Sequence, residues 1–158
     1  MPTLPELIDT LPQRGTVEWI GIRPARKAPL EALQQVEVKA DHGLMGDHYA
    51  NPGGNRQVTL IQAEHLSAVA SMLGIDAVEP DNVRRNIVVS GINLLALKDK
   101  DFFVGSVELS FSGLCHPCSR METALGPGGY NALRGHGGIT ARVLGGGTIR
   151  NGDEVGIK

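Results

Sequence analysis

The sequence has few of the features that hold together a small secreted domain or a membrane protein. Only two of its 158 residues are cysteine, which excludes a scaffold built on several disulfides. No apolar run approaches the roughly 18 residues that mark a membrane span. The N-terminus carries Pro2, Pro5 and Glu6 where a secretory signal would have a basic start and an apolar run. We therefore expect a cytoplasmic protein with no membrane partner.

An excess of charge of either sign is also missing. The chain has 15 basic and 17 acidic residues, and its formal net charge is −2. Such a balance creates no overall field that attracts nucleic acid or an anionic surface. Any anion must therefore be recognised locally by a few side chains. We expect a small-molecule substrate and no nucleic acid.

Glycine, in contrast, is abundant and indicates short elements. The chain has 21 glycines and nine prolines, against a usual glycine content of roughly 7%. Only residues 63–73 show apolar positions at clear helical spacing. Apolar and turn patterns, with clear period-two alternation at 16–22 and 107–111, predict strands over 16–22, 36–38, 56–61, 83–91, 139–144 and 155–157, and a strand pair over 102–111 that is broken at Gly105. The length and these patterns predict a single domain over residues 1–158, mainly β with a few short helices and without βαβ alternation.

Both cysteines stand in a Cys-x-x-Cys motif within residues 113–122, between a predicted strand and a short helix. Ser119 and Glu122 match a capping box, which predicts a helix that begins here and ends before Gly126. Cys118 then directly precedes the helix N-terminus, where the aligned peptide dipoles favour an anion, and Arg120 lies two residues away. We expect Cys118 to act as a thiolate.

Three chemistries remain open for this motif. A structural zinc site needs four ligands, and only these cysteines and histidines from distant loops could supply them. A thioredoxin-like redox pair has the right spacing, but its first cysteine normally begins a long helix within a βαβ unit. The third interpretation is a single active thiolate at Cys118, either as a soft metal ligand or as a sulfur carrier, with Cys115 auxiliary.

Other polar segments are candidates for binding an anionic ligand. The loop over 41–55 is rich in glycine and polar residues, and His48 is its leading candidate. The glycines around Arg134 and His136 would let main-chain N–H groups approach an anion. Arg84 and Arg85 begin a predicted strand, so they should point to opposite faces and contribute unequally. The basic run that includes Arg23 and Arg26 is interpreted as a solvated surface. The binding candidates are His48, Arg56, Arg84, Arg85, Asn86, Arg134, His136 and Gly137.

Taken in order, several segments resemble the MOSC domain, named after the C-terminal domain of molybdenum-cofactor sulfurases. They are Gly43-Leu44-Met45-Gly46-Asp47-His48, Arg56-Gln57-Val58-Thr59-Leu60, Arg84-Arg85-Asn86-Ile87, residues 113–118, 134–138 and 147–155. The resemblance covers about residues 17–157 and is to the small stand-alone bacterial type. It implies a β-barrel-like fold and a pocket for the molybdenum cofactor, a pterin with a dithiolene and a phosphate. It also implies that Cys118 is the functional cysteine.

Two functions follow from the resemblance as expectations. The first is an oxidoreductase that reduces N-hydroxylated compounds, with Cys118 as the molybdenum ligand and an electron-donor protein as partner. The second is a non-enzymatic carrier that holds a persulfide on Cys118 and is loaded by a cysteine desulfurase. The sequence contains neither the desulfurase domain nor the extra N-terminal β domain of larger relatives. Pyridoxal phosphate is therefore not expected to bind this domain alone.

Overall fold

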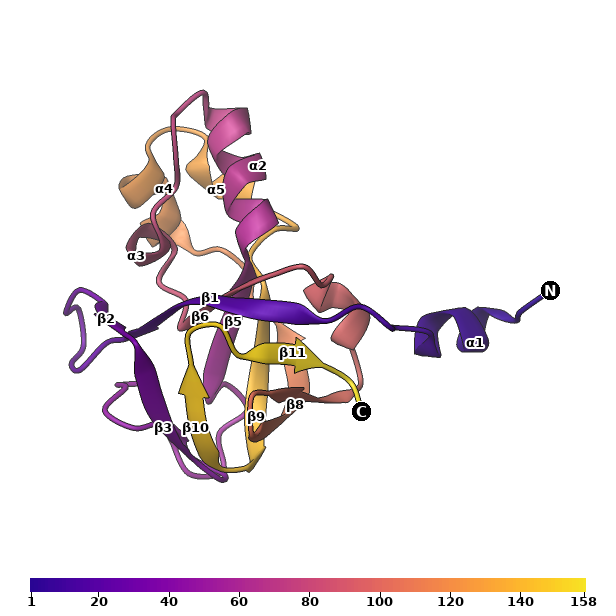
Figure 1. The fold of residues 1–158 in the computed structure, drawn as a ribbon. Coiled ribbons are helices and arrows are strands. Elements are labelled where there is room, and N and C mark those ends of the chain that lie inside the picture. The colour runs from indigo at the N-terminus through magenta and orange to yellow at the C-terminus, as the bar shows by residue number, and fades with distance from the viewer.

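Seven strands close into a barrel in the computed structural model, which describes all 158 residues (Figure 1). Around the barrel, each strand pairs with the next and β11 pairs back to β1. The order is β1 (Gly15–Ile22), β6 (Ile87–Ser90), β5 (Val58–Gln62), β9 (Ile139–Gly145), β8 (Val107–Leu114), β7 (Asp101–Val104) and β11 (Glu154–Gly156). The prediction of a mainly β, barrel-like fold is confirmed.

The remaining strands extend the barrel at its edges. The short strand β2 (Glu31–Leu33) pairs with the end of β1. A separate three-stranded sheet contains β10 (Gly147–Arg150), β3 (Gln35–Lys39) and β4 (Gly43–Leu44) in that order. The loop after β4 lies next to the end of β1. There the His48 N–H donates to the Arg23 carbonyl at 2.7 Å.

The helices are short and mostly gather on one side of the barrel (Figure 1). They are α1 (Leu4–Asp9), α2 (Ala63–Leu73), α3 (Pro80–Val83), α4 (Ser119–Leu125), α5 (Gly129–Leu133) and a 3-10 turn at Leu94–Leu97. Only α1 projects away from the rest. The helix predicted over 63–73 is confirmed at both ends, and α5 replaces an expected glycine-rich turn. None of these helices combines the length and apolar character needed to cross a membrane.

One βαβ unit is present, and the expectation of none is wrong at this place. Strands β5 and β6 run parallel and are joined through α2 and α3. The physical reason is that β5 is buried on both faces, since all five of its residues are buried. Parallel strands of this kind need a helical cover as well as a core.

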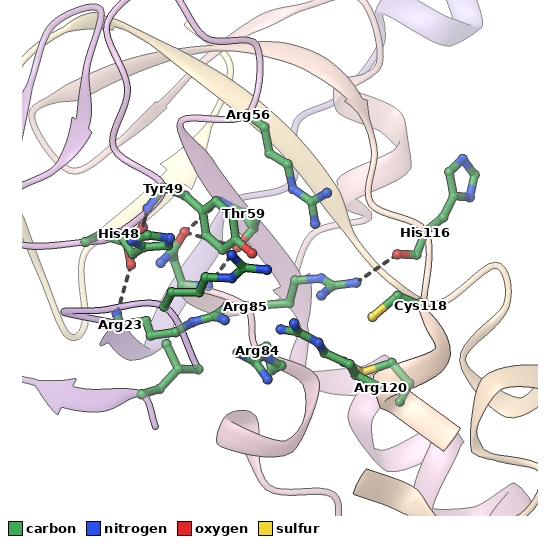
Figure 2. Close-up of a pocket in the computed structure, with 15 residues that line it drawn as sticks. Arg23, His48, Tyr49, Arg56, Thr59, Arg84, Arg85, His116, Cys118 and Arg120 are labelled. Atoms are coloured by element: carbon green, nitrogen blue, oxygen red, sulfur yellow. Dashed lines mark hydrogen bonds between the residues drawn. The ribbon is translucent and has the colours of Figure 1, made fainter. Parts of the chain in front are cut away.

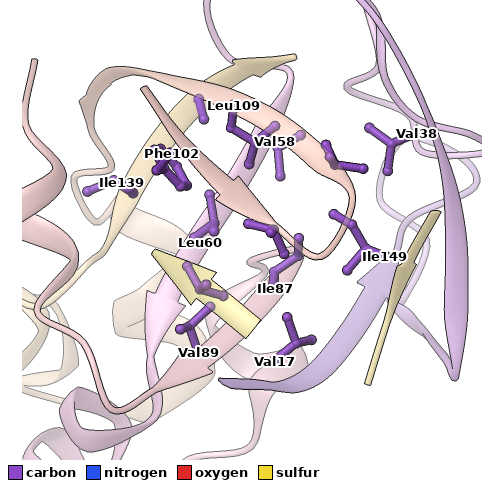
Figure 3. Close-up of a cluster of buried hydrophobic side chains, with 14 of the residues drawn as sticks. Val17, Val38, Val58, Leu60, Ile87, Val89, Phe102, Leu109, Ile139 and Ile149 are labelled. Carbon is purple, nitrogen blue, oxygen red and sulfur yellow. The ribbon is translucent and has the colours of Figure 1, made fainter. Parts of the chain in front are cut away.

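The two faces of the barrel wall carry two separate apolar cores. Inside the barrel, Val58 and Leu60 of β5 pack with Ile87 and Phe102 in a cluster of 23 buried residues (Figure 3). Outside it, Ile61 of β5 packs in a second cluster of 10 buried residues, contributed largely by the helices. Because neighbouring strand residues face opposite sides, Thr59 also points outward, towards the helical side.

The strand predicted over 83–91 is shorter than expected, and this changes the argument about its arginines. The chain forms α3 up to Val83, and β6 begins only at Ile87. Arg84 ends the helix in the left-handed conformation, with φ of +58°. Strand alternation therefore does not apply to Arg84 and Arg85, and both can face the same side.

The capping box predicted for Ser119 and Glu122 is wrong by one residue. Cys118 is itself the N-cap of α4, and no side chain caps the helix. The Glu122 carboxylate instead accepts the N–H groups of Tyr130 at 2.9 Å and Gly128 at 3.0 Å. These two bonds hold the pKa of Glu122 below its ordinary value. Through these hydrogen bonds, Glu122 of α4 holds the start of α5 in place.

The turn before β9 supplies a stability prediction. Gly135 and Gly138 both have positive φ, at +79° and +87°. A Cβ at Gly135 would meet open space, whereas one at Gly138 would collide with the Leu60 carbonyl. We expect Gly135→Ala to lower the free energy of unfolding by about 1–2 kcal/mol, from backbone strain alone. Gly138→Ala should lower it by about 3–5 kcal/mol, because the collision adds to the strain.

Urea denaturation of both variants and the wild type checks this expectation. Equal losses for the two alanines would show that the barrel wall at Leu60 can move away from the turn.

Candidate functional site

A cavity of about 550 Å³ lies on the outer wall of the barrel, beside the helices. Segments distant in the sequence meet there: the end of β1, the loop after β4, the residues that enter β5 and β6, and the start of α4. Figure 2 shows the residues that line it. They are Arg23, Arg26, Leu30, Asp47, His48, Tyr49, Arg56, Thr59, Arg84, Arg85, Asn86, His116, Cys118, Arg120 and Met121.

The charge of this lining differs sharply from that of the whole chain. It contains six of the 15 basic residues and one of the 17 acidic residues, which gives +5 when histidine is neutral. The other nine basic and 16 acidic residues give −7. The single acid, Asp47, is already engaged, because its carboxylate accepts the N–H of Arg23 at 2.9 Å and of Tyr49 at 3.3 Å. The cavity is therefore suited to an anion.

Two arginines at the floor of the cavity have donors without acceptors. The Arg23 side chain is buried, with 4% of its residue exposed, and its Nε has no hydrogen-bond partner. The Nη2 atom of the half-buried Arg84 is likewise buried and unpaired. Buried polar groups are nearly always hydrogen-bonded, so an anionic ligand at this floor would supply acceptors that these atoms lack. Arg26, Arg56 and Arg120 are exposed and form the rim.

Arg85 has a different role, because its guanidinium binds main-chain carbonyls. Nε donates to Gly137 at 2.9 Å and Nη1 to Val83 at 2.8 Å. Nη2 donates more weakly to Cys115 at 3.5 Å and to His116 at 3.4 Å (Figure 2). Burial lowers the pKa of the guanidinium, while the neighbouring Cys115 thiol acts in the opposite direction. Arg85 thus holds the cysteine segment against the turn before β9.

Asn86 is also committed to the scaffold. Its side-chain oxygen accepts the Thr59 N–H at 3.0 Å and the Thr59 hydroxyl at 3.1 Å. Its side-chain nitrogen donates to the Gly21 carbonyl at 3.1 Å. These bonds connect β1, β5 and the start of β6 directly behind the cavity. Asn86 therefore positions the wall of the cavity.

The two cysteines are in different environments. Cys115 is buried, and its sulfur accepts a hydrogen bond from Arg56 Nη2 at 3.3 Å. Cys118 is exposed and lines the cavity, and Figure 2 shows its sulfur on the same side as the arginines. Nowhere do three His, Cys, Asp or Glu side chains converge to hold a metal ion. This arrangement does not provide the four ligands of a structural zinc site.

The structure brings together five of the residues predicted to bind a cofactor: His48, Arg56, Arg84, Arg85 and Asn86 all line the cavity, as does Cys118. The other three lie outside it. Arg134 bonds Asn131 at 3.3 Å, and the His136 ring packs edge-on against His65 with centroids 4.8 Å apart. Gly137 contributes its carbonyl to Arg85 from behind.

Sequence reasoning missed the contribution of Arg23 and Arg26, which were interpreted as a solvated surface. Both line the cavity, and Arg23 is one of its most buried side chains. One signal was available: Arg23 directly follows a strand and precedes a proline. That pattern marks a strand end, but it does not show what lies opposite it.

Several solved structures have a similar fold. The YUAD protein from Bacillus subtilis has a TM-score of 0.80 at 18% identity, covering 92% of this chain and 97% of that one. YiiM from Geobacillus stearothermophilus has a TM-score of 0.71 at 16% identity, covering 89% and 73%. YiiM from Escherichia coli has a TM-score of 0.68 at 14% identity, covering 90% and 69%. At these identities the likeness shows the fold alone.

Sequence comparison identifies the family. No curated protein matches the chain significantly, whereas the family model described as the MOSC domain matches residues 20–156. This range contains the barrel from the end of β1 to β11 and every residue that lines the cavity. The resemblance found in the sequence motifs is confirmed, and the chain belongs to the MOSC domain family.

Proposed function

We propose that the chain binds the molybdenum cofactor in the arginine cavity, with Cys118 as a ligand of the metal, and reduces N-hydroxylated compounds. One observation carries this proposal: a single exposed thiol opens onto a cavity lined by six arginines and one acid. A cofactor that combines a phosphate with a thiol-binding metal matches both parts. Membership of the MOSC domain family supports the same ligand.

The floor of the cavity fits the phosphate of that cofactor. The unpaired donors Arg23 Nε and Arg84 Nη2 are buried there and need acceptors. Guanidinium groups present paired N–H donors that match phosphate oxygens. The one carboxylate of the lining, Asp47, accepts main-chain N–H groups and forms no salt bridge with these arginines.

Cys118 fits the metal. A thiolate is a soft ligand of the kind that transition metals accept, and Cys118 is the accessible sulfur in the cavity. The chain brings no three metal-binding side chains together, so the further ligands would come from the dithiolene of the cofactor. The carbonyl contacts of Arg85 would keep the Cys118 segment in place.

The proposed reaction consumes two electrons and two protons for each N-hydroxyl group. The N–O bond breaks, a new N–H bond forms, and the oxygen leaves as water. When bound, the cofactor supplies the two-electron redox chemistry, and an electron-donor protein is the proposed reductant. His48 lines the cavity and is the proposed proton donor, because the His116 ring points away (Figure 2).

The exposure of Cys118 supports a second candidate, a carrier of persulfide sulfur. A carrier must present its sulfur to a donor such as a cysteine desulfurase and to an acceptor, and Cys118 is accessible while Cys115 is buried. The arginine cavity has no evident role in this alternative.

Elemental analysis tests the proposed function. We expect protein purified from a host that makes the cofactor to contain molybdenum and pterin in equal amounts, close to one per chain. Cys118→Ser should lose the metal and the activity, because it removes the accessible sulfur. Cys115→Ser should keep most of the metal and most of the activity. The Cys115 sulfur is buried and accepts a hydrogen bond from Arg56, so it is not placed to bind the metal.

Equal losses in the two serine variants would contradict this assignment and favour a cysteine pair. Metal-free wild-type protein with a labile sulfane on Cys118 would instead support the carrier.

The floor arginines give a separate prediction. Arg23→Gln and Arg84→Gln should each weaken cofactor binding by about 1.5–3 kcal/mol, the scale of a hydrogen bond to a charged group. Arg150→Gln is the matched control, because this exposed arginine lies on β10 outside the cavity. Pterin retained after gel filtration measures the effect, with urea denaturation to confirm equal folding. Unchanged retention in both floor variants would move the phosphate elsewhere.

A further inference from the structure

The cavity holds more positive charge than one phosphate neutralises. A phosphate monoester carries about 1.5–2 negative charges at neutral pH, whereas the lining has six arginines and one aspartate. The floor arginines Arg23 and Arg84 suffice for that phosphate, and Arg85 is occupied by main-chain carbonyls. Arg56 is shared with the Cys115 sulfur. Arg26 and Arg120 remain at the rim, and neither forms a salt bridge.

Arg120 is placed where a substrate would have to pass. It lies in the first turn of α4, two residues after the N-cap Cys118, and both residues are exposed and line the cavity. Figure 2 shows its guanidinium extended over the cavity towards Arg84. Like charges held on one surface repel each other unless an anion lies between them. Arg120 therefore offers a binding site for a second anionic group, in addition to the phosphate that the floor arginines would hold.

A second hollow continues from the rim and is also cationic. It has a volume of about 260 Å³, shares Leu30, Arg84 and Arg120 with the main cavity, and adds Lys27 and Asn82. Its one acid, Asp81, is already engaged, since Oδ1 accepts the Leu30 N–H at 3.0 Å. A ligand larger than the cofactor's own phosphate can therefore extend outward from Cys118 past Arg120.

We infer that the substrate of this site carries a negatively charged group, such as a carboxylate, which Arg120 binds at the rim while the N-hydroxyl group lies at Cys118. This inference rests on the proposed function, because it uses the floor arginines for the cofactor. It makes Arg120 a specificity-determining residue. The substrate class is an N-hydroxylated compound with an acidic substituent.

The experiment compares two amidoximes that differ in one charge, benzamidoxime and 4-carboxybenzamidoxime. Cofactor-loaded protein reduces each with two equivalents of a one-electron viologen donor, and two protons yield the amidine and water. We expect the wild type to have a kcat/KM about two- to fivefold higher for the carboxylated compound, the scale of an exposed ion pair. Arg120→Gln should remove that preference, whereas Arg150→Gln, with the same change in net charge, should retain it.

Direct binding gives a readout that does not depend on turnover. The probe is 4-carbamoylbenzoate, which has no N–O bond, with benzamide as its uncharged counterpart, both measured by calorimetry on the loaded protein. Arg120→Gln should weaken the binding of 4-carbamoylbenzoate about two- to fivefold relative to that of benzamide.

Reduction of both amidoximes at equal rates, with no effect of Arg120→Gln on either, would overturn the inference and leave the proposed reaction intact. If neither amidoxime is reduced but the probe binds through Arg120, the anion subsite is supported and the proposed reaction fails.

Discussion

The contacts of the buried Arg85 guanidinium are the interaction on which the site depends. One side chain donates to the carbonyls of Val83, Cys115, His116 and Gly137. These carbonyls belong to the entry into β6, the cysteine segment and the turn before β9, which are distant in the sequence. A buried charge is costly unless its donors are satisfied, so the three segments must stay together. The geometry of Cys118 relative to the floor arginines follows from that requirement.

The charge of the cavity opposes the stability of the protein. Six arginines line one surface with a single acid, and buried donors on Arg23 and Arg84 lack acceptors. Each such feature costs folding free energy, which the two apolar cores must offset. An anion that binds only the folded chain stabilises it by mass action. The same groups that oppose folding therefore favour the presence of an anion in the cavity.

The barrel supports this site because β5 is covered on both sides. Its inward residues Val58 and Leu60 fill the barrel, and its outward residue Ile61 packs beneath the helices. Thr59 lies between them on the outer face, where it bonds Asn86. The cavity is thus built against a strand that is buried on both faces, while the exposed Cys118 at the start of α4 lies in its lining.

Much of this protein follows from the sequence alone. Apolar runs between turn signals predicted most of the strands, helical spacing predicted α2 at both ends, and the ordered motifs pointed to the family, since all of these are local patterns in the chain. The face that Arg84 and Arg85 share was decided by the left-handed turn at Arg84, which no alternation rule anticipates. The burial of Arg23 and the exclusion of Arg134 and His136 from the cavity depend on which segments meet across the barrel wall. Such meetings are long-range contacts, and only the tertiary structure decides them, because the free energy that brings these segments together comes from apolar cores far from the charged residues themselves.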